Sequence, residues 1–159
     1  MRVLAIDPGY ERLGIAVMEK NEGKEKLLHS ACLVTDKIKR HEDRLLELGQ
    51  KLGEILNKYR PECVAIETLF FNQNRSTAVK VAEVRGMVIH IAKEYGCEMR
   101  EFGPQEVKVA VTGYGKSDKR AVVDMVKRLL NDAPAKALDD EYDAIAIGIA
   151  ALAHTPNLP

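Results

Sequence analysis

The chain has 159 residues, of which 46% are hydrophobic and 30% are charged. This length suits one domain with a hydrophobic core of its own, and the composition excludes a disordered or low-complexity chain. Lysine and arginine together number 24, as do aspartate and glutamate, so the zero net charge does not indicate a nucleic-acid partner. No apolar stretch reaches the ~20 residues that cross a bilayer, and no basic segment precedes a long apolar one at the N-terminus. We therefore expect a cytoplasmic protein that does not associate with membranes.

The order of apolar runs and turn residues predicts an α/β fold. Three strands come first, and the short turns between them favour an antiparallel meander over residues 2–7, 14–20 and 27–35. The remaining predicted elements are a helix over 42–59, a strand over 63–69, a helix over 76–95, a strand over 98–102, a helix over 104–111, a helix capped by Ser117 that runs to about residue 130, and a helix over 140–153. This order predicts a mixed five-stranded sheet, three antiparallel strands and then two parallel ones, with helices on both faces. Residues 1–155 are expected to form a single domain, followed by a short tail over 156–159.

Charge is unevenly distributed along the chain. Lysine and arginine outnumber the acids over residues 69–93 and 100–128, whereas the acids dominate residues 131–143. A metal-dependent phosphodiesterase needs such an arrangement, because basic side chains hold phosphates and carboxylates hold the metal. Ordinary solvated surface charge accounts for the pattern equally well, so charge alone leaves both interpretations open.

Two carboxylates interrupt apolar runs that predict buried strands. Asp7 closes the first strand and begins an Asp-Pro-Gly sequence, which is also typical of a plain turn. Glu67 lies near the carboxyl end of the predicted central strand. A buried carboxylate is costly unless it is paired or binds a metal, and neither strand contains a basic partner, although a distant one could reach. If these strands are neighbours, a divalent cation between Asp7 and Glu67 would relieve their repulsion.

Two further acids stand at the start of the last predicted helix. Asp140 and Asp143 are three residues apart, which puts both on one face. Acids in a first helical turn favour the helix dipole, and this accounts for Asp140. It accounts poorly for Asp143, which leads directly into a buried apolar segment. The four acids together would suit Mg²⁺ or Mn²⁺, and two such ions about 4 Å apart can activate a water and stabilise the leaving oxygen in phosphodiester hydrolysis.

At these residues the chain resembles the RuvC-type Holliday junction resolvases of the ribonuclease H-like superfamily. The matching segments are Ile6-Asp7-Pro8-Gly9 with Gly14, Ala65-Ile66-Glu67 followed by Phe70-Phe71 and Asn74, Arg85-Gly86, and Asp140-Glu141-Tyr142-Asp143-Ala144. They lie in one colinear order over essentially the whole chain, and the combination is much more specific than Asp-Pro-Gly alone. The resemblance implies a ribonuclease H-like α/β fold, which agrees with the predicted order of elements.

The resemblance also implies an activity. Family members are homodimeric endonucleases that bind four-way (Holliday) DNA junctions and nick two opposed strands symmetrically, in recombination and DNA repair. Mg²⁺ is the implied cofactor, with two ions bound and with Mn²⁺ able to substitute. The nicks leave 5′-phosphate and 3′-hydroxyl ends that a ligase can seal. The implied partner is a branch-migration motor complex of the RuvA–RuvB type.

Site residues follow from the resemblance position by position. The implied catalytic residues and metal ligands are Asp7, Glu67, Asp140 and Asp143. Lys108 and Lys119 would face the scissile phosphate and the backbone, and Phe70 would stack on a base near the crossover. From the residues themselves, either Phe70 or Phe71 could stack on unpaired bases. Lys116 and Lys119 flank a Gly-Tyr-Gly loop at a helix N-terminus, where phosphate binds readily, although solvated lysines fit the same sequence. Asn74 and Arg75 complete the expected DNA-contacting residues.

Three other functions compete with this interpretation of the sequence. An ATP-binding domain of the actin and sugar-kinase type needs a second phosphate motif and a second domain, for which 159 residues leave no room. A related ribonuclease H-like nuclease that acts on RNA or an RNA–DNA hybrid would carry the same acids. A non-catalytic junction-binding protein would not need all four acids. The Phe-Phe-x-x-Asn segment and the acid pair of the last helix favour the junction resolvase.

Overall fold

Five strands form one mixed sheet. The structure, a computed structural model, describes residues 1–68 and 75–154 and all their side chains except those of Arg75 and Ser76. The sheet has the order β3-β2-β1-β4-β5, with β1 at Arg2–Asp7, β2 at Arg12–Asn21, β3 at Lys24–Val34, β4 at Cys63–Glu67 and β5 at Glu98–Phe102. The first three strands pair antiparallel, whereas β4 runs parallel to both β1 and β5. The predicted mixed sheet is therefore confirmed.

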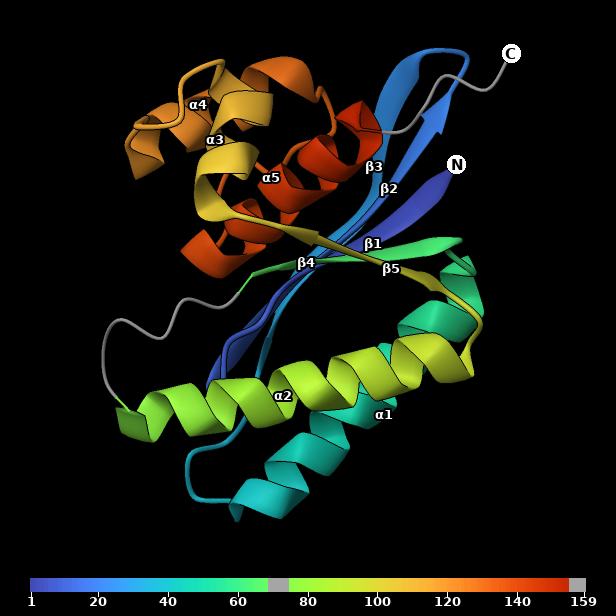
Figure 1. Cartoon of the computed structure of the whole chain (residues 1–159), viewed down its shortest axis with the longest axis vertical. Helices are drawn as coiled ribbons and strands as arrows, with labels where there is room; N and C mark the ends of the chain where they lie inside the picture. The colour runs from blue at the N-terminus through green and yellow to red at the C-terminus, as the bar shows by residue number, and fades with distance from the viewer. Residues whose placement is uncertain (69–74, 155–159) are drawn as a thin grey trace.

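Helices cover both faces of this sheet (Figure 1). They are α1 (His41–Tyr59), α2 (Arg75–Glu94), α3 (Pro104–Thr112), α4 (Lys119–Leu129) and α5 (Asp139–Ala153). Alternate residues of a strand point to opposite faces, and β1 accordingly serves two cores. Leu4 and Ile6 belong to the core with α1 and α2, whereas Val3 and Ala5 belong to the core with α3, α4 and α5.

Helix α5 packs closely on β1 and β2, and half of its buried residues are alanine or glycine. A Cβ added at Gly148 would lie 2.4 Å from Met18 Sδ and 3.4 Å from Ala5 Cβ. Glycine at this position therefore lets the helix backbone approach the two central strands, and the approach carries the acids of the first turn of α5 toward the sheet.

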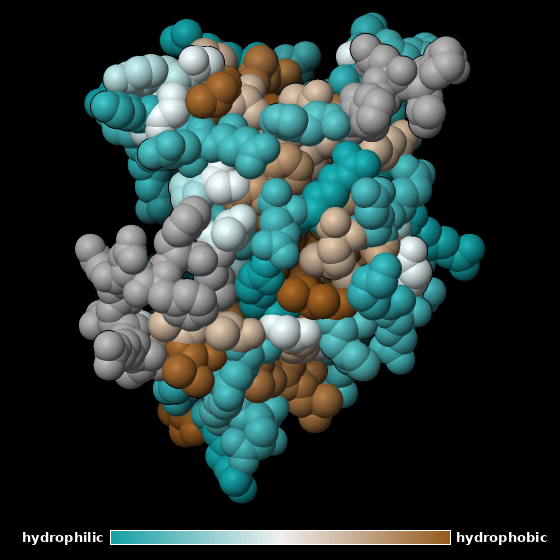
Figure 2. Space-filling view, viewed as in Figure 1, coloured by the Kyte–Doolittle hydropathy of each residue, from teal (hydrophilic) through white to brown (hydrophobic). Residues whose placement is uncertain are grey.

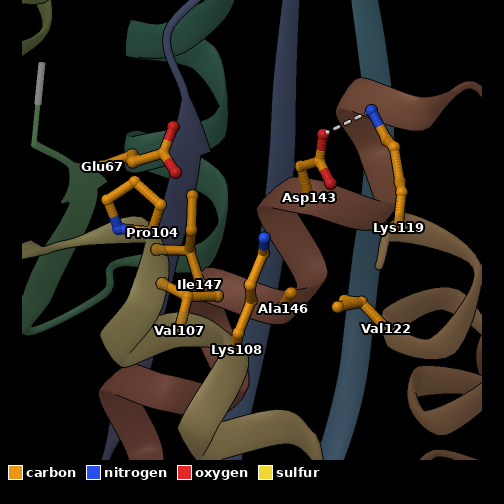
Figure 3. A pocket seen from close by; sticks show the side chains of 9 residues that line it. All are labelled: Glu67, Pro104, Val107, Lys108, Lys119, Val122, Asp143, Ala146 and Ile147. Carbon is orange, nitrogen blue, oxygen red and sulfur yellow. Dashed lines mark ion pairs between the residues drawn. The ribbon is translucent and has the colours of Figure 1, made fainter. Parts of the chain in front are cut away.

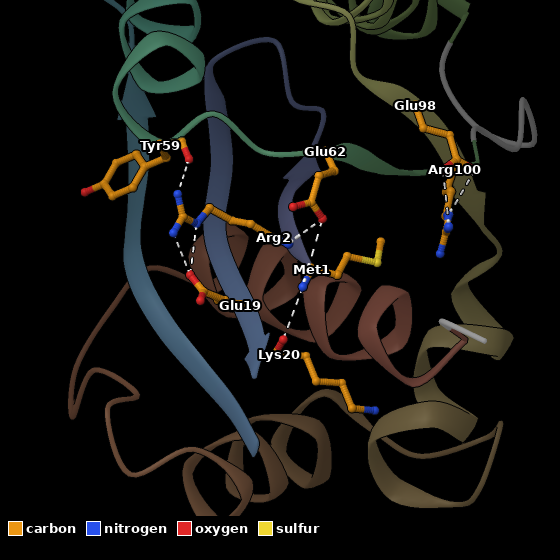
Figure 4. Close-up of polar contacts among 8 residues, drawn as sticks. All are labelled: Met1, Arg2, Glu19, Lys20, Tyr59, Glu62, Glu98 and Arg100. Carbon is orange, nitrogen blue, oxygen red and sulfur yellow. Dashed lines mark hydrogen bonds and ion pairs between the residues drawn. The ribbon is translucent and has the colours of Figure 1, made fainter. Parts of the chain in front are cut away.

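The end of the sheet at which β1 begins is held by polar contacts of Arg2 (Figure 4). The Arg2 guanidinium forms an ion pair with Glu19 of β2 at 2.6 Å and donates a hydrogen bond to the carbonyl of Tyr59 at the end of α1. These contacts fix α1 to β1 and β2. The carboxyl ends of β1 and β4 lie at the opposite end of the sheet.

Several boundaries differ from the sequence prediction. Strands β2 and β3 extend further toward each other than predicted, because their polar ends continue to pair across a tight turn at Glu22 and Gly23, both with positive φ. Strand β4 ends at Glu67. The predicted cap Ser117 was wrong, since Asp118 caps α4 by accepting a hydrogen bond from the Ala121 amide at 2.8 Å. The predicted tail over 156–159 lies outside the described residues.

Hydrophilic side chains cover most of the face seen in Figure 2. Hydrophobic ones gather in small groups, several of them in the lower half of the view, over α1 and α2. Among the helices that the structure describes, none combines the length and the apolar character needed to span a membrane.

Candidate active site

Asp7 and Glu67 end two neighbouring parallel strands. Ile6 of β1 is paired with Ile66 of β4, so the two acids follow at equivalent positions on the same edge of the sheet. The condition in the sequence argument, that these two strands are neighbours, is therefore met. Asp7 leads into a tight turn at Gly9, where an added Cβ would lie 2.0 Å from the carbonyl oxygen of Arg12. The turn therefore needs glycine, and it brings β2 back beside Asp7.

Gly14 opens the space that the start of α5 occupies. It is paired with Asp7 across β1 and β2, and a Cβ at Gly14 would lie 1.8 Å from the carbonyl oxygen of Asp140. Two side-chain contacts hold the same turn of α5. Arg12 Nε lies 3.4 Å from Asp140 Oδ2, and the Ser30 hydroxyl donates to Glu141 Oε1 at 2.6 Å. The chain thus places the backbone of Asp140 directly against the strand that neighbours Asp7.

Glu67 and Asp143 line a cavity of about 210 Å³ together with Lys108 and Lys119 (Figure 3). Lys119 Nζ lies 3.0 Å from Asp143 Oδ2 and 3.3 Å from Asp139 Oδ2. Lys108 extends toward the space between Glu67 and Asp143. The other lining residues are Pro104, Val107, Val122, Ala146 and Ile147. Acids and cations therefore meet at the mouth of a partly apolar hollow, and the apolar lining limits the screening of their charges by water.

The acids at this edge raise one another's pKa. Burial, together with the charges of Asp143, Glu67 and Asp140, raises the pKa of Asp7 to about 7. Burial also raises the pKa of Glu67, with a further contribution from Asp143. The pKa of Asp143 is raised by burial, although its ion pair with Lys119 opposes the shift. Like-charged carboxylates held together in this way are typical of functional sites.

The donor set fits a hard divalent cation. Four carboxylates from β1, β4 and α5 supply the oxygen ligands that Mg²⁺ and Mn²⁺ prefer. The buried Oδ2 of Asp140 has no hydrogen-bond partner among the described residues, and its contact to Arg12 at 3.4 Å is an ion pair of poor geometry. No group of three or more potential ligands in the described part of the chain is already gathered as tightly as a metal site requires. In this arrangement the ammonium group of Lys119 offsets part of the negative charge of the acids.

The comparison with known proteins identifies the family. The model for the crossover junction endodeoxyribonuclease RuvC family matches residues 3–153. The chain belongs to the RuvC family. RuvC of Caldanaerobacter subterraneus is 42% identical to it over 94% of this chain and 90% of the relative. RuvC of Prochlorococcus marinus is 36% identical over 94% and 96%.

Solved structures agree with this RuvC assignment. The chain matches Thermus thermophilus RuvC in complex with a Holliday junction substrate with a TM-score of 0.88 and 34% identity, over 94% of this chain and 92% of the other. It matches the yeast mitochondrial Holliday junction resolvase Ydc2 with a TM-score of 0.64 and 17% identity, over 94% and 78%. The second likeness concerns the fold alone. The expected ribonuclease H-like fold is confirmed.

The predicted site residues of this RuvC-family chain fall into four groups. Glu67, Asp143, Lys108 and Lys119 line the cavity. Asp7 and Asp140 lie beside it and are linked to it through charge. Lys116 is exposed in the loop between α3 and α4 and does not line the cavity. Phe70 and Asn74 lie outside the described residues, as does the Arg75 side chain at the start of α2.

Two contacts of the RuvC-family site were missed in the sequence. Arg12 pairs with Asp140, and Asp139 shares Lys119 with Asp143. Arg12 begins β2, and no pattern in the surrounding sequence distinguishes it from a solvated arginine. The position of Asp139 just before Asp140 was visible, but it indicated only a favourable charge at a helix start.

Proposed function

We propose that this chain is a metal-dependent endonuclease that resolves four-way DNA junctions by nicking two opposed strands symmetrically, in recombination and repair in the cytoplasm. One observation carries the proposal. In a member of the RuvC family, the edge of the sheet gathers Asp7, Glu67, Asp140 and Asp143 beside Lys108 and Lys119. Carboxylates that repel one another need a cation, and lysines beside them suit a phosphate.

The four acids are the proposed ligands of two Mg²⁺ ions, for which Mn²⁺ can substitute. When bound, such ions polarise the scissile phosphate and lower the pKa of the attacking water. The protein contributes the positions of the ligands. Asp7 and Glu67 are fixed by strand pairing, and Asp140 and Asp143 are fixed by the packing of α5 on Gly14.

The two lysines are the proposed ligands of the DNA backbone. Lys108 extends between Glu67 and Asp143, and Lys119 lies 3.0 Å from Asp143. In hydrolysis a water oxygen adds to phosphorus and the bond from phosphorus to the 3′ oxygen breaks. The water loses a proton and the leaving 3′ oxygen takes one up, which gives the 5′-phosphate and 3′-hydroxyl ends. Cations at the phosphate stabilise the charge that develops on its oxygens.

Four residues outside the cavity are proposed to contact the junction. Phe70 would stack on a base near the crossover, which is worth roughly 1–3 kcal/mol. Asn74 and Arg75, just before or at the start of α2, and the exposed Lys116 would contact the strands on either side. Contacts of basic residues with phosphates fix the position of the protein on DNA.

A second copy of the chain is the proposed occupant of the groove between α1 and α2. Apolar side chains of Leu45, Leu46, Met87 and Ile91 line the groove together with Tyr95, and polar residues such as Gln50, Glu54 and His90 complete the lining. Leu46 is 61% exposed and adjoins the other apolar residues, so the groove offers a continuous apolar strip to a partner. Two copies are needed if two opposed strands are to be cut symmetrically. A branch-migration motor complex of the RuvA–RuvB type is the proposed further partner.

The test compares a synthetic four-way junction with a linear duplex of the same sequence. Wild type and Asp7→Asn are each incubated with Mg²⁺, with Mn²⁺ and with EDTA. We expect paired symmetric nicks on the junction that need the metal and that Asp7→Asn abolishes while junction binding survives. A junction that is bound but uncut in both metals would overturn the nuclease proposal. If only an RNA–DNA hybrid is cleaved, the proposed nuclease activity is supported and the proposed junction substrate is wrong.

A further inference from the structure

Tyr10, Thr35, Arg44 and Lys80, which we name the Tyr10 cluster, meet beside the turn that follows Asp7. Arg44 of α1 donates from Nε to Thr35 Oγ1 and from Nη1 to the Tyr10 hydroxyl, each at 2.8 Å. Its guanidinium carbon lies 4.1 Å from the centre of the Tyr10 ring. Lys80 of α2 places Nζ 4.6 Å from the same centre. The Tyr10 ring therefore holds two cations, three residues along the chain from Asp7.

The positive charge of the cluster is not paired directly with an acid among the described residues. Arg44 is only 4% exposed, and its Nη2 has no hydrogen-bond partner within the described part of the chain. Glu11 is close enough for the charge of Arg44 to act on it, but it pairs with Lys37, and Glu83 contacts His41. A buried cation with no direct ion pair is costly. An anion bound at the cluster would reduce this cost.

The Tyr10 hydroxyl has a hydrogen bond left to donate. A phenolic oxygen can accept one hydrogen bond while its proton is donated to another group. Here the oxygen accepts from Arg44, and no acceptor for the proton is present among the residues that the structure describes. A hydroxyl that accepts from a charged guanidinium is a stronger donor. Together with the exposed ammonium of Lys80, it offers an anion one donor and one cation.

We propose that the Tyr10 cluster binds a backbone phosphate of the DNA strand that passes the active site. Lys80 and the Tyr10 hydroxyl would contact the phosphate, with the charge of Arg44 behind them. Tyr10 belongs to the turn that carries Asp7, so the site shares an edge of the sheet with the carboxylates. The identity of the ligand rests on the proposed function, because the substrate of a DNA nuclease is a chain of phosphates. Such a contact fixes the position of the strand relative to Asp7 without reading its sequence.

The neighbouring basic loop before α1 is a weaker candidate. Its three cations are already paired with acids, Lys37 with Glu11, Lys39 with Glu47 and Arg40 with Glu42. Releasing any of them to a phosphate would expose an acid to the DNA. In this corner of the molecule, the cations free to take a phosphate are therefore those of the Tyr10 cluster.

The test measures the affinity of the protein for a labelled four-way junction and for a linear duplex, in EDTA so that neither is cut. Salt is varied, because each phosphate contact contributes about 0.9 to the slope of log affinity against log salt. The variants are Lys80→Gln and Tyr10→Phe. Lys24→Gln is the matched control, because Lys24 is an exposed lysine paired with Asn21 at the far end of β2 and β3. Arg44 is left intact because it also supports the fold.

We expect Lys80→Gln to lower the slope by about one and to weaken binding roughly eightfold at 0.1 M salt, as one lost contact predicts. Tyr10→Phe should weaken binding several-fold with a smaller change in slope, because a hydroxyl carries no charge. Lys24→Gln should match wild type. Equal behaviour of Lys80→Gln and wild type, or of Lys80→Gln and Lys24→Gln, would overturn the proposal even if wild type resolves junctions. If wild type cuts no junction but Lys80→Gln still lowers the slope on linear duplex, the site stands and the proposed function fails.

A further experiment distinguishes a phosphate of DNA from a free phosphate ion as the ligand of the cluster. Inorganic phosphate is added at 10 mM and constant ionic strength, which on its own should not displace the DNA. Displacement by phosphate from wild type and not from Lys80→Gln would assign the site to a free phosphate and would overturn the DNA assignment.

Discussion

Asp7 holds a carboxyl group where its charged form is unfavourable. Its pKa of about 7 in the metal-free fold lies far above the ordinary value of 3.8, first because of burial and then because of three neighbouring acids. Between these values the folded state binds more protons than the unfolded one. The free energy of unfolding therefore falls as pH rises from about 4 to about 7.

Replacing Asp7 should consequently stabilise the metal-free protein. We expect Asp7→Asn to raise the free energy of unfolding by roughly 2 kcal/mol at pH 8, about half of the value that the pKa shift implies, because the neighbouring groups relax. The gain should shrink as pH is lowered to 5, where the wild-type carboxyl is protonated in the fold. Thermal unfolding of both proteins in EDTA, at pH 8 and at pH 5, measures the gain in stability and its decrease. A lower melting temperature for Asp7→Asn at pH 8 would contradict the electrostatic account.

The same pKa predicts how the metal requirement depends on pH. A cation must displace the proton from Asp7 below pH 7, whereas above pH 7 the carboxylate is already free. The Mg²⁺ concentration for half-maximal cleavage should therefore fall several-fold between pH 6 and pH 8. Cleavage rates across a Mg²⁺ titration at each pH measure it. A requirement that does not change with pH would contradict the prediction.

At the scale of elements, the position of α5 decides where two of the four acids lie. The close approach at Gly14 and at Gly148 leaves no space for a side chain. We expect Gly14→Ala to displace the start of α5 and to lower the cleavage rate at least 100-fold. A displacement of catalytic groups by about 1 Å can reduce a rate by this factor. Gly103→Ala is the control, since nothing lies within 4 Å of a Cβ at Gly103. Junction nicking by both variants measures the effect, and full activity of Gly14→Ala would contradict it.

The elements differ in how well the sequence predicts them. Apolar runs predicted β1 and β4 as buried strands of one mixed sheet, but that the two strands are neighbours was a condition of the sequence argument and appears only in the structure. The hairpin ends of β2 and β3 are polar on both sides, so no hydrophobic pattern predicts their length. The choice between Ser117 and Asp118 as a cap depends on the local geometry of the loop before α4, which the sequence pattern does not fix. Ser117 is engaged with Thr112 and the carbonyl of Tyr114, which leaves Asp118 to cap α4.

The residues of the candidate site also differ in how well the sequence predicts them. Its acids were predictable because each one breaks a local pattern or matches a family segment. The contacts of Arg12 with Asp140 and of Arg44 with Tyr10 join residues far apart in the chain, and nothing near either arginine in the sequence indicates a partner. Such pairs depend on how the strands and helices pack, so they appear only in the structure.

At the scale of the whole molecule, zero net charge conceals a division of surfaces. The carboxyl ends of β1 and β4 gather charged groups at one edge, whereas α1 and α2 form a groove elsewhere that has an apolar strip with polar residues beside it. The proposed dimer would use this groove. Leu46→Glu should yield a monomer that folds normally and makes single rather than paired nicks, because a charge at an interface core is costly.

Light scattering after size exclusion and the nicking pattern on a junction measure these outcomes. Leu129→Glu is the matched control, because Leu129 of α4 is 50% exposed and lies on the other side of the sheet. A wild-type protein that is monomeric at micromolar concentration would contradict the dimer. Equal loss of association in both variants would place the interface elsewhere.

The ion pair between Lys119 and Asp143 has a thermodynamic consequence. One ammonium group cannot neutralise Asp143 and a DNA phosphate at the same time. If the proposed function holds, a cation that took over Asp143 would release Lys119 to the substrate, and a phosphate that engaged Lys119 would leave Asp143 open to a cation. Loading of the metal and capture of DNA should then be positively cooperative, each tightening the other by the same factor. Without either ligand, Lys119 offsets part of the negative charge of Asp139 and Asp143.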